Sequence, residues 1–538
     1  MTISKSAFAF YFSALLLCAL YQPVLSKDLL KSFVWGVSQT AYQTEGAWNA
    51  DGKGLSIWDT FTQNQGMIYN NQNAQVGTDF YHRYKEDIQI MKKLGVKNFQ
   101  MSISWSRILP LGTLDSVNQK GVEFYNNVFT ALKEAGIEPW VTLFHWDLPA
   151  ALNDRTSNGG WLNKDIVRKF NDYAEFCFKN FGDKVKYWLT FNEILEFAWA
   201  GYGDGSLAPG RCSPDVDPNC IRVGGGGDSS TEPYTVVHNA LLAHAYAVKT
   251  YKLKYQATQK GKIGLSADTD FALPYNFRNP RDVQAADTYM AFNYGWIVDP
   301  LVFGRYPEIM RKLVTGKRLP EFTEIESQLI KGSYDFLGID QYSSVFVKYN
   351  GDIGNNWQED SRVIEMDTDV FGNAIGAKTG TEWQSVHPIG MRGLLQWISK
   401  RYNNPALYVF ENGVSAPGEA SLPVQKARFD DFRVDFYRDY IDNMLAAKFF
   451  DGVNVKGYFA FSLTDNFEWT DGYNVKFGLV HVDYSKNLTR TIKTSGYYYS
   501  EIMNSTLEFD LVKDQLEPFN KANHHDIRNF VSTFDSTQ

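Results

Sequence analysis

The sequence predicts an α/β fold, a (β/α)8 TIM barrel built as a single domain. Short apolar runs alternate with longer amphipathic stretches along nearly the whole chain, and eight such runs are present. When each strand is followed by a helix, the strands pair in parallel and the helices form the crossover connections. With 538 residues, 44% hydrophobic and 21% charged, the chain has the composition of a globular protein with a substantial core.

The first residues have the pattern of a targeting segment. Lys5 precedes an apolar stretch over residues 7–20 and a short exit that ends near Ser26. We expect a signal peptide over 1–26 and the barrel domain over 27–538. An uncleaved anchor is the alternative, but no later segment reaches the ~18 apolar residues of a membrane span. The expected location is the secretory pathway, either outside the cell or in a lysosome-like or vacuole-like compartment.

The eight predicted strands are short and bounded by turn signals. They are Phe33–Val37, Asn98–Ser104, Glu138–Phe144, Tyr187–Thr190, Lys262–Ala267, Phe336–Ile339, Ala406–Phe410 and Lys456–Phe461. Apolar residues three and four apart predict helices between them. These helices are Phe80–Leu94, Gly121–Ala135, Asp165–Phe181, Pro233–Tyr251 and Phe429–Ala447.

An open doubly wound sheet also alternates strand with helix. A nucleotide-binding sheet of that kind would carry a Gly-rich phosphate turn after its first strand, and Phe33–Gln43 has none. Gly224–Gly227, the richest Gly run, follows no predicted strand and is interpreted as a flexible surface loop. The barrel is therefore favoured.

Charge and cysteine content narrow the function further. A net charge of −8 argues against nucleic-acid binding, which needs clustered Lys and Arg. Cys212 and Cys220 flank a Pro- and Asp-rich loop, and an oxidising compartment would let them form a disulfide, whereas Cys177 has the surroundings of a buried thiol. Sequons at Asn487 and Asn504 are compatible with glycosylation.

Two acids directly follow predicted strands that end at one mouth of the barrel. Glu193 follows the fourth strand and Glu411 the seventh. Glycosidic cleavage requires such a pair, one carboxyl protonated to assist the leaving oxygen and one ionised to attack the anomeric carbon or position water. Two structural acids held by Arg or Lys partners are the alternative. Asn192 favours the catalytic interpretation, because its amide could hold a sugar 2-hydroxyl.

Seven segments in order resemble glycoside hydrolase family 1, of the β-glucosidase type. They are Phe33-Val-Trp-Gly36, Tyr42-Gln-Thr-Glu-Gly-Ala-Trp48, Ser102-Ile-Ser-Trp-Ser-Arg107, Phe144-His-Trp-Asp-Leu-Pro149, Thr190-Phe-Asn-Glu193, Phe410-Glu-Asn-Gly413 and Asp465-Asn-Phe-Glu-Trp469. The resemblance implies hydrolysis of terminal non-reducing β-D-glucosyl residues from small-molecule or oligosaccharide β-glycosides. It also implies double displacement with net retention and neither a cofactor nor a metal.

The resemblance assigns roles to individual residues. It makes Glu193 the general acid and base and Glu411 the nucleophile. The residues that it implies hold the glycone hydroxyls are Gln43, His145, Asn192, Glu468 and Trp469. It also implies that Tyr342 hydrogen-bonds the nucleophile and that Trp383 forms a wall of the aglycone side. Glu468 argues against a sugar phosphate, and a thioglucosidase of the mustard type would resemble Gln at position 193.

Four positions depart from the family pattern, and we expect all four to cluster around the proposed site. Gln100 stands where the family usually has an arginine beside the nucleophile, and Asp340 replaces the usual asparagine. Both changes should raise the pKa of Glu411, since nearby opposite charge favours the ionised form. Phe461 replaces a tryptophan, and Phe410 replaces a small hydroxyl residue. The hypothesis is a modified substrate preference or a lower pH optimum.

Two other functions are compatible with the sequence. One is a transglycosidase on the same scaffold, in which an acceptor hydroxyl outcompetes water. The other is a catalytically weak sugar-binding homologue, which retention of both Glu193 and Glu411 disfavours. The sequence does not separate glucose from galactose or fucose, and it leaves the oligomeric state open.

Overall fold

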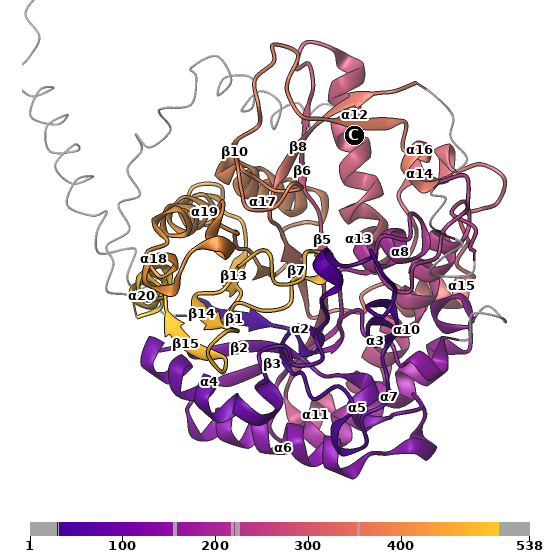
Figure 1. The fold of residues 1–538 in the computed structure, drawn as a ribbon. Helices are drawn as coiled ribbons and strands as arrows, with labels where there is room; N and C mark the ends of the chain where they lie inside the picture. Colours follow the sequence, from indigo (N-terminus) through magenta and orange to yellow (C-terminus); the bar gives the residue numbers. More distant parts are fainter. Residues whose placement is uncertain are drawn as a thin grey trace, which may run out of the picture.

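Eight parallel strands close into a barrel, which confirms the predicted fold class (Figure 1). The computed structural model describes residue 30 and residues 32–504, apart from 154–158, 217–219, 221–225 and 352–355. The expected signal peptide lies outside the described residues. Around the barrel the strand order is β1-β13-β12-β7-β5-β4-β3-β2.

Every predicted strand is present in the barrel. The barrel strands are β1 (Val34–Gln39), β2 (Asn98–Ser102), β3 (Glu138–Phe144), β4 (Tyr187–Asn192), β5 (Lys262–Asp268), β7 (Phe336–Asp340), β12 (Leu407–Glu411) and β13 (Val455–Phe461). Several run one or two residues further than the sequence predicted. As a result Asn192, Asp340 and Glu411 are the last residues of their strands, at the mouth.

Helices pack around the strands, and all five predicted helices are present with ends shifted by at most three residues. The longer helices are α4 (Phe80–Leu94), α6 (Gln119–Glu134), α7 (Ile166–Phe181), α8 (Ile194–Tyr202), α10 (Glu232–Lys254), α12 (Pro280–Phe292), α13 (Tyr294–Phe303), α17 (Pro388–Arg401), α19 (Asp431–Phe449) and α20 (Thr494–Met503). The short helices are α2 (Ala41–Thr44), α3 (Ile57–Phe61), α5 (Trp105–Ile108), α11 (Gln256–Gln259), α14 (Glu308–Leu313), α15 (Glu324–Ile330), α16 (Trp357–Asp360) and α18 (Val424–Ala427).

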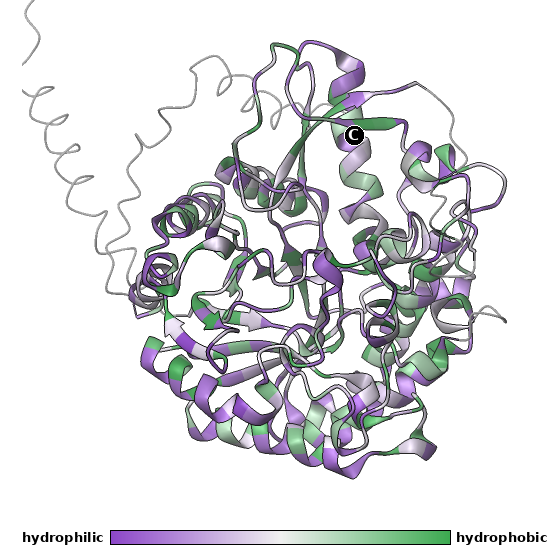
Figure 2. Cartoon of the chain, in the orientation of Figure 1, coloured by the Kyte–Doolittle hydropathy of each residue, from purple (hydrophilic) through white to green (hydrophobic). Residues whose placement is uncertain are grey.

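Helix α4 illustrates why these segments fold as they do. It buries Ile88, Met91 and Leu94, which lie three residues apart on one face. The helix ends at Gly95, whose φ of 75° is the left-handed conformation that terminates helices. Figure 2 shows hydrophilic and hydrophobic residues alternating along α4 and α6 at the edge of the molecule. The apolar faces of these helices supply the core between helices and strands.

Aromatic side chains fill the inside of the barrel below the mouth. Phe410 packs there at 5.6 Å from Trp140 and 5.2 Å from Phe459, measured between ring centroids. A Cβ atom at Gly338 would lie 2.7 Å from the Phe410 ring, so the glycine makes room for it. The expectation that Phe410 belongs to the surroundings of the site is therefore wrong, because its strand directs the ring into the barrel core.

Three small sheets were not predicted. They are formed by β6 (Phe271–Pro274), β8 (Ser344–Tyr349) and β9 (Val363–Met366), by β10 (Ala377–Lys378) and β11 (Ser385–Val386), and by β14 (Val480–Asp483) and β15 (Thr489–Ile492). Helix α12 packs against β6 and β8, and Figure 1 shows this group at the top of the view. These segments extend the loops that follow barrel strands, so they shape the mouth.

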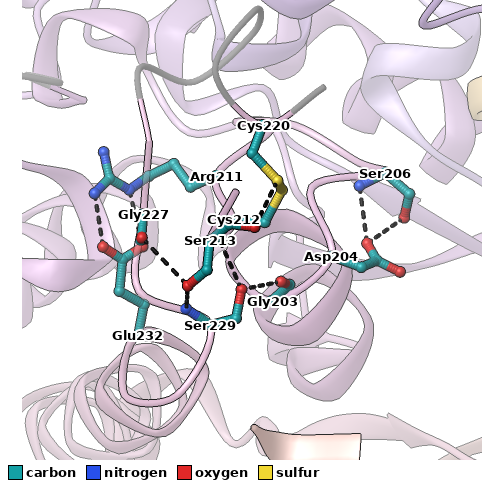
Figure 3. Close-up of a disulfide and its surroundings, with 10 residues drawn as sticks. All are labelled: Gly203, Asp204, Ser206, Arg211, Cys212, Ser213, Cys220, Gly227, Ser229 and Glu232. Carbon is teal, nitrogen blue, oxygen red and sulfur yellow. Dashed lines mark hydrogen bonds and ion pairs between the residues drawn. A yellow bond between two sulfur atoms is a disulfide. The ribbon is translucent and has the colours of Figure 1, made fainter. Parts of the chain in front are cut away.

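The predicted disulfide joins Cys212 to Cys220, with Cα atoms 5.2 Å apart (Figure 3). Arg211 beside it forms an ion pair with Glu232 at 2.6 Å, which anchors the loop to the start of α10. Cys177 is buried and free, and burial raises the pKa of its thiol. Of the Gly224–Gly227 run only Gly226 and Gly227 lie within the described residues, in a loop. Among the helices described, none is long and apolar enough to span a membrane.

Candidate active site

Glu193 and Glu411 line a single cavity of about 710 Å³ at the carboxyl ends of the barrel strands. Glu411 is the last residue of β12, and Glu193 comes directly after β4. Strands β5 and β7 lie between them in the barrel. Residues 218 positions apart in sequence therefore share one cavity because parallel strands place their carboxyl ends on one face.

The backbone at the mouth is strained at three residues that line this cavity. Trp146, Glu193 and Trp469 have φ values of 71°, 48° and 47°, in the left-handed region that favours glycine. Glu193 directly precedes α8, and its amide donates to the Ser266 carbonyl at 3.1 Å. Such conformations persist only where the surrounding structure holds them, and they concentrate at functional sites.

The two acids are buried and lie among other carboxyls. Burial first, and then repulsion from Glu411, Asp268 and Asp340, raise the pKa of Glu193 well above its usual range. Burial also raises the pKa of Glu411 to about 8, against a lowering by the Tyr342 hydroxyl. The Tyr342 hydroxyl donates to Glu411 Oε2 at 2.7 Å. Glu411 Oε1 has no hydrogen-bond partner. Groups that interact in this way titrate as a unit rather than independently.

Three acids stand in register on neighbouring strands. Asp268 of β5 pairs with Asp340 of β7, and Asp340 pairs with Glu411 of β12. Asp340 is only 1% exposed, and neither of its carboxyl oxygens has a hydrogen-bond partner among the residues that the structure describes. Burial, followed by repulsion from Glu411, raises the pKa of Asp340 well above its usual range. No described Lys, Arg or His forms an ion pair with any of the three.

Gln100, in place of the arginine usual in the family, supplies no positive charge beside Glu411. Its side chain is fully buried and donates to Thr142 Oγ1 at 2.8 Å, while its Oε1 is unpartnered. The pKa of Glu411 is raised in the direction expected from Gln100 and Asp340, but the causes are burial first and then repulsion from Asp268. A nucleophile with a higher pKa is ionised only at higher pH, so it moves the acidic limb of activity upward. The hypothesis of a lower pH optimum therefore has the wrong sign.

A separate group of polar residues forms the inner end of the cavity. The Gln43 amide donates to Glu468 Oε2 at 3.3 Å and to the Phe467 carbonyl at 2.9 Å. His145 is buried, and burial lowers the pKa of its imidazole to about 3, so the ring is neutral. Burial raises the pKa of Glu468 well above its usual range. These side chains present neutral donors and acceptors, which suit the hydroxyls of a sugar.

Aromatic rings hold the same end in place. The Trp469 ring lies 4.4 Å from Trp146, 4.6 Å from Trp58 and 5.9 Å from His145 between centroids. Asn192 is fully buried and is not among the residues that line the cavity. Its amide nitrogen lies 3.5 Å from His145 Nε2, and its side chain lowers the pKa of Glu411. Asn192 thus lies beneath the cavity, between His145 and the acid.

Residues 25–507 match the family model described as glycosyl hydrolase family 1. The chain belongs to glycosyl hydrolase family 1. Rice (Oryza sativa subsp. indica) β-glucosidase 12 is 44% identical over 487 residues, covering 89% of this chain and 93% of the relative. The crystal structure of a rice β-glucosidase matches with a TM-score of 0.84 and 42% identity, covering 87% and 97% of the two chains. A β-glucosidase from the fungus Humicola insolens, solved with glucose, matches with a TM-score of 0.84 and 42% identity, covering 88% and 98%.

The outer side of this family 1 cavity is bounded by Trp383. Its side chain is 52% exposed and stacks on Phe477, with ring centroids 6.3 Å apart. Tyr342 meets Trp383 edge to face at 5.7 Å. Phe461, one of the departures from the family pattern, also lines the cavity, 6.0 Å from Tyr342. Trp383 is thus an exposed flat surface next to the nucleophile.

Sequence reasoning missed a further group of cavity residues. They are Trp146, Glu196, Trp199, Asp268, Asp270, Tyr289, Trp357 and Glu365. Asp268 and Asp270 close or directly follow β5, so the strand-end rule that selected Glu193 would also have selected them. The other outer residues come from α8, α12, α16 and β9, and no local pattern predicts that these elements meet. Within the described residues no cluster of His, Cys, Asp or Glu has the arrangement of a metal site.

Proposed function

We propose that this chain is a retaining β-glucosidase in which Glu411 is the nucleophile and Glu193 the general acid and base. One observation carries the proposal: both carboxyls open on one cavity, and neither forms an ion pair with a described cation. Membership of family 1 and the β-glucosidases at 42–44% identity support the reaction type. Two acids with a purely structural role would be paired with Arg or Lys, and such cations would lower their pKa values.

The reaction would proceed in two displacements. Glu411 Oε1, which has no competing partner, attacks the anomeric carbon while the bond to the aglycone oxygen breaks. The Glu193 carboxyl, kept protonated by burial and by Glu411, gives its proton to that oxygen. Glu193 then takes a proton from water, whose oxygen displaces Glu411 from the anomeric carbon and restores both groups. Two inversions give net retention.

The remaining residues would position the sugar. Gln43, His145 and Glu468 supply donors and acceptors to the glucosyl hydroxyls at the inner end, and Trp469 supplies an apolar face. Asn192 would reach the 2-hydroxyl from beneath. The Tyr342 hydroxyl fixes the orientation of Glu411 at 2.7 Å, and Trp383 would stack against the aglycone. The same intermediate would serve a transglycosidase if an acceptor hydroxyl replaced water.

We also propose that the protein enters the secretory pathway and is glycosylated. The pattern of residues 1–26 and the Cys212–Cys220 disulfide support an oxidising compartment. Asn487 is exposed in the turn between β14 and β15, and its side-chain oxygen accepts a hydrogen bond from Arg83 at 2.9 Å. Mass measurement of the secreted protein before and after glycosidase treatment tests this proposal.

The reaction is tested by following hydrolysis of an aryl β-glucoside by proton NMR. The proposal predicts β-glucose as the first product, with α-glucose appearing only by mutarotation. Glu411→Gln and Glu193→Gln should both lose turnover. Folded wild-type protein that binds glucose but releases no product would instead support the sugar-binding alternative.

A further inference from the structure

The cavity is strongly acidic well beyond the two proposed catalytic groups. Nine of its lining residues are Asp or Glu, and none of the lining residues that the structure describes is Lys or Arg. We name four of the nine the acidic wall: Glu196 at the start of α8, Asp268 at the end of β5, Asp270 two residues further on, and Glu365 on β9.

The acidic wall is not neutralised by the protein. No ion pair joins any of its members to a described Lys, Arg or His. Next to the wall, Asp340 is 1% exposed with both oxygens unpartnered, and Asp268 Oδ1 is unpartnered as well. Asp340 also lines the cavity, so a buried polar group without a partner faces the space that a ligand would fill. Burying such groups is costly unless something pairs with them.

Aromatic rings are interleaved with the wall. Trp199 Nε1 donates to Glu196 Oε2 at 3.0 Å, and the Tyr289 hydroxyl donates to Glu365 Oε1 at 3.2 Å. Trp199 and Trp357 stack with centroids 5.5 Å apart and planes 15° apart. Each of these three aromatic side chains lines the cavity. Aromatic faces beside carboxylates are the combination that recognises organic ammonium groups, through cation–π attraction and charge pairing.

Burial adds electrostatic strain that a cation would relieve. Burial raises the pKa of Asp268 and of Asp270 to about 7, and that of Glu196 to about 8. Repulsion from Glu365 and Asp268 contributes to the shift at Asp270. A positive charge placed among these groups would favour their ionised forms and gain from all of them at once. A neutral aglycone would gain nothing from these negative charges.

We propose that the acidic wall is an aglycone subsite for a cationic group, so that the preferred substrates are β-glucosides whose aglycone carries an ammonium nitrogen. The inference rests on the proposed β-glucosidase activity and names its substrate class. The glucosyl unit occupies the inner end with its anomeric carbon at Glu411. The aglycone then extends outward past Trp383 toward Glu196, Asp270 and Glu365.

The test compares two substrates that differ only in charge. One is para-(trimethylammonioethyl)phenyl β-glucoside, and the other is its neutral carbon isostere, para-(neohexyl)phenyl β-glucoside. The two leaving groups are matched, and a quaternary ammonium stays charged at every pH. We expect kcat/KM for the cationic substrate to exceed that for the isostere by about tenfold, the size of a cation–π contact that is partly shielded from water. Glucose release is the readout.

Variants of the wall decide whether it is the source of the preference. Asp270→Asn/Glu365→Gln removes two negative charges at the partly exposed rim and should bring the ratio of the two kcat/KM values close to one. Circular dichroism and thermal unfolding check that the variant is folded, and the ratio of the two kcat/KM values is taken on the same variant preparation. Glu123→Gln/Glu134→Gln removes two charges from the exposed outer face of α6 and should leave the ratio unchanged.

The outcomes separate the two proposals. Absence of hydrolysis of either substrate by folded wild-type protein would refute the β-glucosidase proposal itself. Equal rates on both substrates, with no effect of the wall variant, would overturn the cationic subsite while leaving the β-glucosidase intact. A preference that the α6 control variant also abolishes would assign it to the overall negative charge and would overturn the subsite as well.

Discussion

The neighbouring barrel strands β12 and β13 lead into two buried acids, Glu411 and Asp465, whose pKa values are shifted in opposite directions. Asp465, which follows β13, receives Lys493 Nζ at 2.7 Å and His481 at 3.2 Å. Burial raises the pKa of Asp465, but Lys493, His481 and Lys476 together outweigh burial and hold this pKa well below its usual range. Glu411, at the end of β12, forms no ion pair with a Lys, Arg or His in the described part of the chain, and burial raises its pKa to about 8. The two acids are similarly buried, so the presence or absence of a cationic partner decides the direction of the pKa shift.

The contrast extends to the groups around each acid. Glu419 pairs with both Lys493 and Arg433, and its pKa is lowered despite burial. We name Asp465, Glu419, Lys493 and Arg433 the paired cluster, and Glu193, Glu411, Asp340 and Asp268 the unpaired cluster. Buried charges that are paired serve structure, whereas unpaired ones cost stability and persist where a ligand or reaction uses them. The two clusters should therefore respond oppositely to mutation.

Removing either proposed catalytic acid should have the largest effect. Glu411→Gln and Glu193→Gln should each lower kcat/KM on an aryl glucoside by about 10³ or more, because each removes a group needed in the transition state. The free energy of unfolding, measured with urea, should stay the same or rise, since an unpaired buried carboxyl is lost. A variant that loses stability along with activity would place its acid with the paired cluster.

Removing the central cation of the paired cluster should give the reverse result. Lys493→Met should lower the free energy of unfolding by about 3–5 kcal/mol, because it leaves Asp465 and Glu419 buried with one cation fewer. Lys486→Met, on the exposed turn between β14 and β15, is the matched control and should change stability by less than ~0.5 kcal/mol. A Lys493 variant as stable as the control would erase the distinction between the clusters.

The unpaired cluster should make stability depend on pH. The pKa of Glu411 rises from 4.5 to about 8 on folding, so folding favours the protonated form. Its stabilising contribution is present below pH 4.5 and is lost as pH rises toward 8. Asp340→Asn removes one such group. It should raise the free energy of unfolding by about 1–3 kcal/mol at the alkaline end and change it little at the acidic end.

Asp268→Asn should alter activity as well. Repulsion from Asp268 contributes to the raised pKa of Glu411. Without that carboxylate Glu411 ionises more readily, so the acidic limb of kcat/KM should move down by about one pH unit. Glu123→Gln, an exposed acid on α6, should move neither the limb nor the stability profile. An acidic limb that stays in place in Asp268→Asn would show that the two carboxyls do not interact.

Trp383 provides the smallest of the expected effects. Its ring lies at the rim, 52% exposed, stacked on Phe477 and edge to face with Tyr342, so we expect it to contact the aglycone and not the reacting atoms. Trp383→Ala should raise KM for an aryl glucoside about fivefold with little change in kcat, since one aromatic contact is lost. A fall in kcat with unchanged KM would instead place Trp383 among the groups that act on the transition state.

The sequence predicted the barrel because each strand is a local signal, and Glu193 and Glu411 because strand ends converge by topology. It also placed Tyr342 correctly beside Glu411. The prediction failed at Phe410. Its side chain points into the barrel core, whereas the side chain of the next residue, Glu411, lies at the mouth. Sequence reasoning also missed Glu365, Tyr289 and Trp357, since their meeting depends on how long loops pack against each other.

The most direct test traps the covalent intermediate. A β-glucoside carrying fluorine at the sugar carbon next to the anomeric centre and a good leaving group should inactivate the protein by accumulating as a glycosyl ester. Peptide mapping by mass spectrometry should then find the sugar on Glu411. A label on any other residue, or none on folded protein that still hydrolyses glucosides, would contradict the assignment of Glu411 as the nucleophile.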